Sequence, residues 1–164
     1  LWSLRDPYLY DLRTRLLSRN GRVLDERHTP TGIRTIVFDA RDGFRLNGER
    51  VKINGVCLHH DLGALGSAVN RSALKRQLTI MKEMGVNSVR CSHNPPSVEL
   101  LDLCDEMGLL VLDEAFDMWE RPKTTYDYAR FFNEHYQKDV KNWIRRDVCS
   151  CIWQRCLPTI SPAV

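Results

Sequence analysis

The sequence lacks any apolar run close to the ~18 residues that a membrane-spanning helix needs, so we expect no membrane partner. It also lacks a strong charge of either sign, because 24 Lys and Arg against 21 Asp and Glu leave +3 in 164 residues. So small and dispersed an excess does not favour a nucleic-acid partner. The composition, 43% hydrophobic and 27% charged, is typical of a globular protein.

A signal peptide is also missing from the sequence. Residues 1–7 read LWSLRDP, with no initiator methionine, no basic n-region and no apolar h-region. This absence favours a cytoplasmic location. The opening residues are typical of a stretch from within a longer sequence.

The six cysteines do not form a recognisable framework. Cys57, Cys91 and Cys104 lie in apolar, periodic segments, which predicts buried free thiols. Three more lie near the C-terminal end, at Cys149, Cys151 and Cys156. They have no partner pair or histidine at zinc spacing, and the chain has no secretory signal, so neither a structural zinc nor a set of disulfides is expected.

Residues 1–41 have the pattern of antiparallel β structure. Residues 12–17 alternate, Asn20-Gly21 provides a turn, and residues 23–28 match as the partner strand. Residues 32–39 predict a third strand. Three strands cannot bury two faces by themselves, so the segment is interpreted as the end of a β-sandwich.

The pattern then changes to alternating strands and helices. A hairpin around Asn47-Gly48 leads into three strand-then-helix units. The strands are predicted at 55–58, 86–91 and 109–112, and the helices at 70–84, 97–107 and about 126–147. Such units favour an α/β fold with a parallel sheet, and both a doubly wound sheet and a (β/α)8 barrel begin this way.

Three strands do not close a barrel, because strand eight must pair with strand one. The sequence therefore predicts helix faces that stay uncovered. They carry Leu74, Leu78, Leu101 and Cys104.

Ionisable side chains follow each predicted parallel strand. They are His59, His60, Asp61, Arg90, His93, Asp113 and Glu114. Because the carboxyl ends of parallel strands meet at one edge, we expect these groups to converge on one cleft.

Two chemistries fit such a cleft. His59, His93 and Asp113 could hold a metal that activates water, or the arginine, histidines and carboxylates could bind the hydroxyls of a sugar. Arg90 disfavours a compact dication site, and the adjacent His59 and His60 point to opposite faces. The residues therefore favour the sugar.

Three segments carry a resemblance to a known family. GVCLHHD at 55–61, RCSHNPP at 90–96 and LDEAFD at 112–117 resemble successive signatures of glycoside hydrolase family 2, and LDLCDEMG at 101–108 fits as well. The resemblance implies a retaining exo-β-glycosidase of the β-galactosidase type.

The implied fold is α/β, a partial (β/α)8 TIM barrel preceded by the last strands of an immunoglobulin-like β-sandwich. Residues 1–41 would end the sandwich, residues 42–147 would begin the barrel, and residues 148–164 form an atypical tail.

The resemblance also implies a set of substrate-binding residues. His59 would contact the sugar or support the transition state, and His93 would reach a sugar hydroxyl. Arg90 would help to hold the region of the nucleophile, and Glu114 would support its neighbours.

No cofactor is expected from the resemblance. Metal-dependent β-galactosidases of the family carry a glutamate and a histidine where this sequence has Asp117 and Trp119. Tryptophan cannot ligate a metal as histidine does, so no metal site is expected. The expected partner is a β-linked sugar, a galactoside before others, and the parent enzyme is expected to be a homo-oligomer.

The sequence departs from the family after Asp147. Members continue with an Asn-His-Pro turn and a strand that ends in the acid/base glutamate, whereas this chain has one charged residue, Arg155, in residues 148–164. We therefore expect both catalytic glutamates to be absent and the 164-residue chain to be inactive. The alternative is a non-catalytic remnant that binds a carbohydrate or a protein partner.

Overall fold

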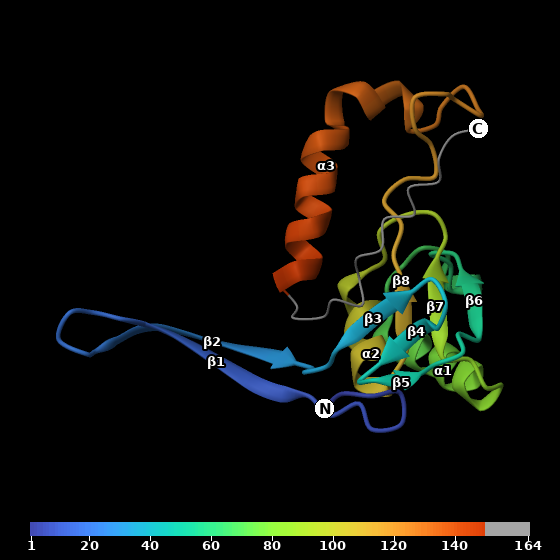
Figure 1. The fold of residues 1–164 in the computed structure, drawn as a ribbon. Helices are drawn as coiled ribbons and strands as arrows, with labels where there is room; N and C mark the ends of the chain where they lie inside the picture. Colours follow the sequence, from blue (N-terminus) through green and yellow to red (C-terminus); the bar gives the residue numbers. More distant parts are fainter. Residues whose placement is uncertain (150–164) are drawn as a thin grey trace.

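The computed structural model describes residues 1–149 and their side chains as far as Asp147. Its first element is a long hairpin of β1 (Tyr10–Leu17) and β2 (Val23–Thr31), which projects from the rest of the molecule as an arm (Figure 1). The expected turn is present, with Gly21 at φ +81°. Cross-strand pairing places Arg15 against Glu26 on one face of this hairpin, and the two form an ion pair.

A second sheet follows, with the order β3 (Ile36–Asp39), β4 (Gly43–Leu46) and β5 (Glu49–Arg50). The predicted third strand is present, but it begins only at Ile36 and pairs with β4. The physical reason is burial, because Ile36 packs on an apolar cluster that includes Phe44 and Leu46.

The third sheet is parallel and has the order β6 (Gly55–Leu58), β7 (Ser88–Cys91) and β8 (Leu110–Leu112). A short helical turn, η1 (Gly63–Leu65), and helix α1 (Arg71–Glu83) connect the first two strands. Helix α2 (Val98–Met107) connects the second and third. These crossovers confirm the α/β fold and the parallel sheet predicted from the sequence.

Local signals set the ends of both helices. The Asn70 side chain accepts a hydrogen bond from the Ala73 N–H, and the Ser97 side chain accepts one from the Leu100 N–H. Gly108 closes α2 in the left-handed conformation, with φ +73°.

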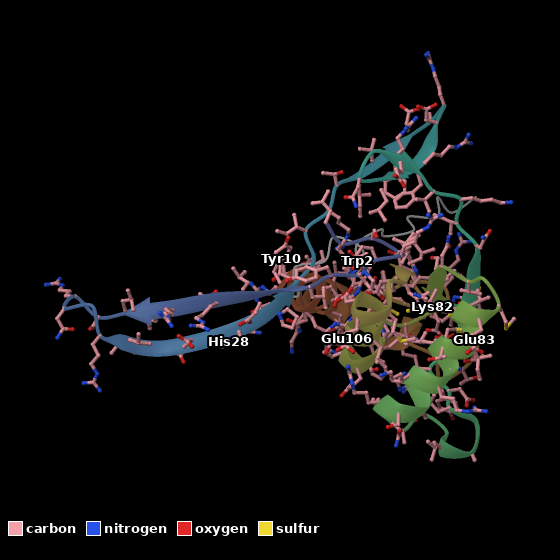
Figure 2. The ribbon with its side chains drawn as sticks, turned by 90° about the horizontal axis from the view of Figure 1, so that it is seen from below. Trp2, Tyr10, His28, Lys82, Glu83 and Glu106 are labelled. Atoms are coloured by element: carbon pink, nitrogen blue, oxygen red, sulfur yellow. The ribbon has the colours of Figure 1, made fainter. Side chains whose placement is uncertain are left out.

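The main core lies between the parallel sheet and the two crossover helices. Leu74, Leu78, Leu101 and Cys104, which were expected to be uncovered, are all buried in it. The expectation is wrong because α1 and α2 pack on the sheet and on each other. Arg71 of α1 forms an ion pair with Glu106 of α2, and the Lys82 ammonium donates to the Met107 carbonyl. Figure 2 labels Lys82 on α1 and Glu106 on α2.

A smaller core is built around Trp2, which the sequence did not mark as important. Trp2 is fully buried with Phe44, Leu46 and Leu110. Its indole N–H donates to the Asp105 carbonyl oxygen at 2.8 Å. One residue thus joins the N-terminal segment, the second sheet and α2, and Figure 2 shows it where the hairpin arm meets the body.

The last described element is α3 (Ala129–Cys149). Phe132 and Trp143 are buried, whereas Phe131 and Ile144 on the same predicted apolar face are exposed. None of the helices in residues 1–149 is long and apolar enough to cross a membrane. The strand considered at 151–153 and the tail cysteines Cys151 and Cys156 lie outside the described residues.

Gly108 provides a test of this packing. A Cβ there would lie 2.7 Å from the Leu4 carbonyl oxygen, whereas a Cβ at Gly85, which has φ +86°, would meet nothing within 4 Å. We expect Gly85→Ala to cost about 1 kcal/mol, for backbone strain alone. Gly108→Ala adds a steric clash and should cost roughly 2–4 kcal/mol in total.

Amide hydrogen exchange measures each cost as a lower free energy of opening, in α1 for Gly85→Ala and in α2 for Gly108→Ala. Equal losses in the two variants would mean that the contact between Gly108 and Leu4 contributes nothing.

Candidate functional site

Three polar side chains meet at the carboxyl-terminal edge of the parallel sheet. The Arg90 Nε donates to Glu114 Oε1 at 2.6 Å, and His93 Nδ1 lies 2.9 Å from Glu114 Oε2. Arg90 lies in β7 opposite Leu112 of β8, so the strand register brings Arg90 next to the residues that follow β8. The Glu114 side chain is 11% exposed, against 37% for Arg90 and 44% for His93. Glu114 is therefore the inner member, and the other two reach solvent.

The geometry assigns the proton of the neutral His93 ring. His93 Nδ1 is 3.2 Å from an Arg90 Nη2 and 2.9 Å from Glu114 Oε2, and one nitrogen cannot accept from the first while donating to the second. The shorter contact is with an ionised acceptor, so we assign the proton to Nδ1, donating to Glu114. The His93 Nε2 then remains as a hydrogen-bond acceptor.

Cys57 of β6 also belongs to this group. The remaining guanidinium nitrogen of Arg90, Nη1, lies 3.4 Å from Cys57 Sγ and 3.1 Å from Ser92 Oγ. Hydrogen bonds from Arg90 and then Ser92 lower the pKa of the Cys57 thiol.

The predicted burial of Cys57 is wrong. Its side chain is exposed on the open face of the sheet, while Cys91 and Cys104 are buried as expected. Burial raises the pKa of Cys91 to about 12.

The residues that follow β6 divide into two groups. The His59 ring lies edge-on to the His93 ring, with 5.6 Å between the centroids, so His59 borders the cluster. His60 Nε2 instead lies 2.9 Å from the Ser67 carbonyl, and Asp61 accepts from the Gly63 N–H at 2.6 Å. These two side chains hold their own loop together and line a small pocket beside the cluster.

Asp113 also points away from the cluster. It is fully buried and accepts a hydrogen bond from the Trp143 indole N–H at 2.6 Å, so it faces α3. Successive residues of an extended chain point to opposite sides, which sends Asp113 outward and Glu114 toward Arg90. In the part of the chain that the structure describes, no three His, Cys, Asp or Glu side chains are arranged to hold a metal ion. The alternative based on His59, His93 and Asp113 therefore has no geometric support.

A small pocket lies beside the cluster, between the loop after β6 and the first turns of the crossover helices. Its lining includes His59, His60, Gln77, Asn94 and Ser97. Arg90 and Glu114 are not part of it. The cluster of Arg90, His93 and Glu114 thus lies outside this pocket, at the open edge of the sheet.

Comparison with known proteins relates this geometry to a family. Residues 1–34 match the model described as glycosyl hydrolases family 2, and residues 39–148 match the TIM barrel domain of the same family. The second match favours the barrel over the doubly wound sheet. The cluster at its strand ends lies where barrel enzymes carry their active sites.

Two curated relatives match nine-tenths of the chain. The chain is 59% identical over 147 residues to the β-galactosidase BoGH2A of Bacteroides ovatus, covering 90% of this chain and 17% of that protein. It is 45% identical over 148 residues to a putative β-glucuronidase of Formosa agariphila, covering 90% of this chain and 14% of that protein.

Solved structures give the same relationship. A family 2 member from Bacteroides cellulosilyticus superimposes with a TM-score of 0.86 at 46% identity, over 90% of this chain and 19% of that one. A β-glycosidase from Bacteroides vulgatus has a TM-score of 0.86 at 44% identity, over the same shares. The chain thus spans less than a fifth of the length of these relatives. The matched segments, the fold and the residues at the strand ends agree, and the chain belongs to glycosyl hydrolases family 2.

Proposed function

We propose that this chain forms part of the sugar-binding edge of a retaining exo-β-glycosidase of the β-galactosidase type. The observation that carries the proposal is the contact of Arg90, His93 and Glu114 at the edge of the parallel sheet. A sugar presents hydroxyl groups that both donate and accept hydrogen bonds, and this group offers both functions. The name of the Bacteroides ovatus relative makes a β-linked galactoside the first substrate to test.

Each residue takes a role from its contacts. Glu114 has both carboxylate oxygens bonded, so it positions Arg90 and His93. His93 offers its Nε2 to a sugar hydroxyl, and His59 extends the same surface. The Arg90 side chain is 37% exposed, so it can also donate to the ligand or to a neighbouring catalytic carboxylate.

The two catalytic glutamates are proposed to lie outside this chain. A retaining mechanism needs two carboxyl groups ~5–5.5 Å apart on either side of the glycosidic bond. We also propose that residues 1–41 end a sandwich domain and residues 42–147 begin the barrel. A homo-oligomeric parent enzyme remains a prediction.

A chimera tests the proposed function directly. Residues 1–147 of this chain replace the matching segment of the Bacteroides ovatus β-galactosidase. We expect the chimera to hydrolyse an aryl β-galactoside faster than an aryl β-glucuronide, because the segment provides binding groups and the host provides both glutamates. A soluble, folded chimera without turnover, beside an active parent, would refute the proposal. A preference for the glucuronide would overturn the choice of sugar.

The same chimera tests His93. His93→Gln should lower kcat/KM about 2- to 10-fold, since it removes one hydrogen bond between neutral groups, of about 0.5–1.5 kcal/mol. The control is His135→Gln, which changes an exposed histidine on α3 and should leave kcat/KM unchanged. Equal effects in the two variants would show that His93 does not contact the substrate.

The 164-residue chain by itself should not hydrolyse the aryl β-galactoside. The loss of essential carboxylates costs many orders of magnitude in rate. Turnover above that of a mock-purified blank would contradict the assignment of both catalytic glutamates to missing segments.

The contact between Arg90 and Cys57 makes a separate prediction. Arg90→Gln removes the main cause of the lowered thiol pKa, so the thiolate fraction at pH 7.5 falls. Iodoacetamide should then modify Cys57 several-fold more slowly, measured by peptide mass spectrometry. Arg71→Gln, which affects an ion pair between α1 and α2, is the control and should not change the rate. An unchanged rate in Arg90→Gln would show that the guanidinium does not activate the thiol.

A further inference from the structure

A second polar cluster lies behind the proposed sugar site and joins α3 to the sheet. Asp113, directly after β8, and Asp147, near the end of α3, are both fully buried. The Trp143 indole N–H donates to Asp113 Oδ2 at 2.6 Å. Arg146 donates to both oxygens of Asp147, at 2.6 and 3.0 Å, and to the Pro96 carbonyl oxygen at 2.7 Å. The cluster thus joins α3 to the segments after β7 and β8.

The charges in this cluster do not balance if both carboxyl groups are ionised. Among the described residues, Arg146 is the one guanidinium in this cluster; it is engaged by Asp147 and Pro96 and approaches Asp113 Oδ2 only at 3.6 Å. No N–H or O–H donor in the described part of the chain reaches Asp113 Oδ1. An ionised Asp113 would therefore be buried with one oxygen unsatisfied, which is costly.

A single proton removes both problems. Arg146 Nη2 lies 3.0 Å from Asp147 Oδ2 and 3.6 Å from Asp113 Oδ2, so the two buried carboxyl groups flank one guanidinium nitrogen. Two carboxyl groups that share a buried site commonly hold one proton between them. With that proton in place, the pair carries one negative charge, which Arg146 neutralises.

Within the part of the chain that the structure describes, the other titratable groups near Asp113 leave this count unchanged. From β7, Cys91 contributes a neutral thiol, because burial raises its pKa to about 12. On the segment of Asp113 itself, Glu114 points to the other side and is paired with Arg90. From α3, Trp143 is uncharged, and Arg146 and Asp147 are already included.

We propose that Asp113 and Asp147 share one proton, which fastens α3 to the edge of the parallel sheet and makes Asp113 a positioning residue for Glu114. Glu114 is the next residue, so the anchoring of Asp113 on one side of the backbone sets where the Glu114 carboxylate lies on the other. The consequence for sugar binding rests on the proposed function, whereas the shared proton does not.

The shared proton makes the attachment of α3 to the sheet depend on pH. Burial, and then the hydrogen bond with Asp147, raise the pKa of Asp113 to about 8, from an unfolded value near 3.9. The folded state therefore holds a proton that the unfolded state releases. The stabilisation is full below about pH 4 and is lost as the pH rises through about 8.

The experiment reads Trp143 directly in the full chain, labelled with ¹⁵N at its tryptophan indoles. The Trp143 resonance, identified by its loss in Trp143→Phe, should shift with pH with a midpoint near 8. Asp113→Asn provides a permanent N–H toward Asp147 and keeps an oxygen for Trp143, so its indole resonance should not shift between pH 6 and 10. The control is Asp117→Asn, an exposed aspartate in the same loop, which should keep the wild-type midpoint.

An indole that does not titrate in the wild type, or one that titrates equally in Asp113→Asn, would overturn the shared proton. If Asp113→Asn does not fold, Asp147→Asn makes the same test, because its amide also donates toward Asp113.

The positioning role has its own readout in the tautomer of His93, measured by ¹⁵N spectra of the histidine rings. The wild type and Asp113→Asn should keep the proton on Nδ1, and Asp113→Ala should give the mixture of an unrestrained histidine. A fixed tautomer in Asp113→Ala would overturn the positioning role. These measurements do not depend on turnover, so failure of the glycosidase proposal and failure of this one are distinguishable.

Discussion

Parallel pairing of β6, β7 and β8 is the constraint on which the rest of this structure depends. It brings the carboxyl ends of three strands to one edge, although the residues that follow them are separated by more than twenty positions in the sequence. Alternation along each strand then decides the side on which a side chain lies. Glu114 meets Arg90 on one side, and Asp113 meets Trp143 on the other. One backbone arrangement thus creates two polar clusters with different surroundings.

The two clusters differ in how their charges are satisfied. At the sheet edge, Arg90 pairs with Glu114 and contacts Cys57, and both Arg90 and His93 remain partly exposed to solvent. Such a site can exchange water for a polar ligand at modest cost. Behind the edge, the carboxyl groups of Asp113 and Asp147 are sealed from water, so their protonation is set by burial and by Arg146.

The helices are held to the sheet by different forces. Helices α1 and α2 bury leucines and Cys104 in one apolar core, which is the usual basis of crossover packing. At its C-terminal end α3 relies on polar contacts, through Trp143, Arg146 and Asp147. Because buried polar contacts are costly when a partner is removed, this attachment is more sensitive to protonation than the apolar core.

Local sequence determined the elements whose signals lie within a few residues. The turn at Asn47-Gly48, the cap at Ser97 and the end of α2 at Gly108 could all be predicted, because each depends on backbone dihedrals and neighbouring N–H groups. The order of the family motifs also predicted the fold and placed Arg90, His93 and Glu114 at one edge.

Tertiary structure alone decided the burial of Trp2, the exposure of Cys57, the pairing of β3 with β4 and the turn of Asp113 toward α3. Tertiary structure also decided that the helix faces with Leu74 and Leu101 are buried. The partners of Trp2 and Asp113, Asp105 and Trp143, lie thirty or more residues away in the sequence. A local pattern shows that a side chain is apolar or charged, but only the packed chain decides which neighbour removes it from water.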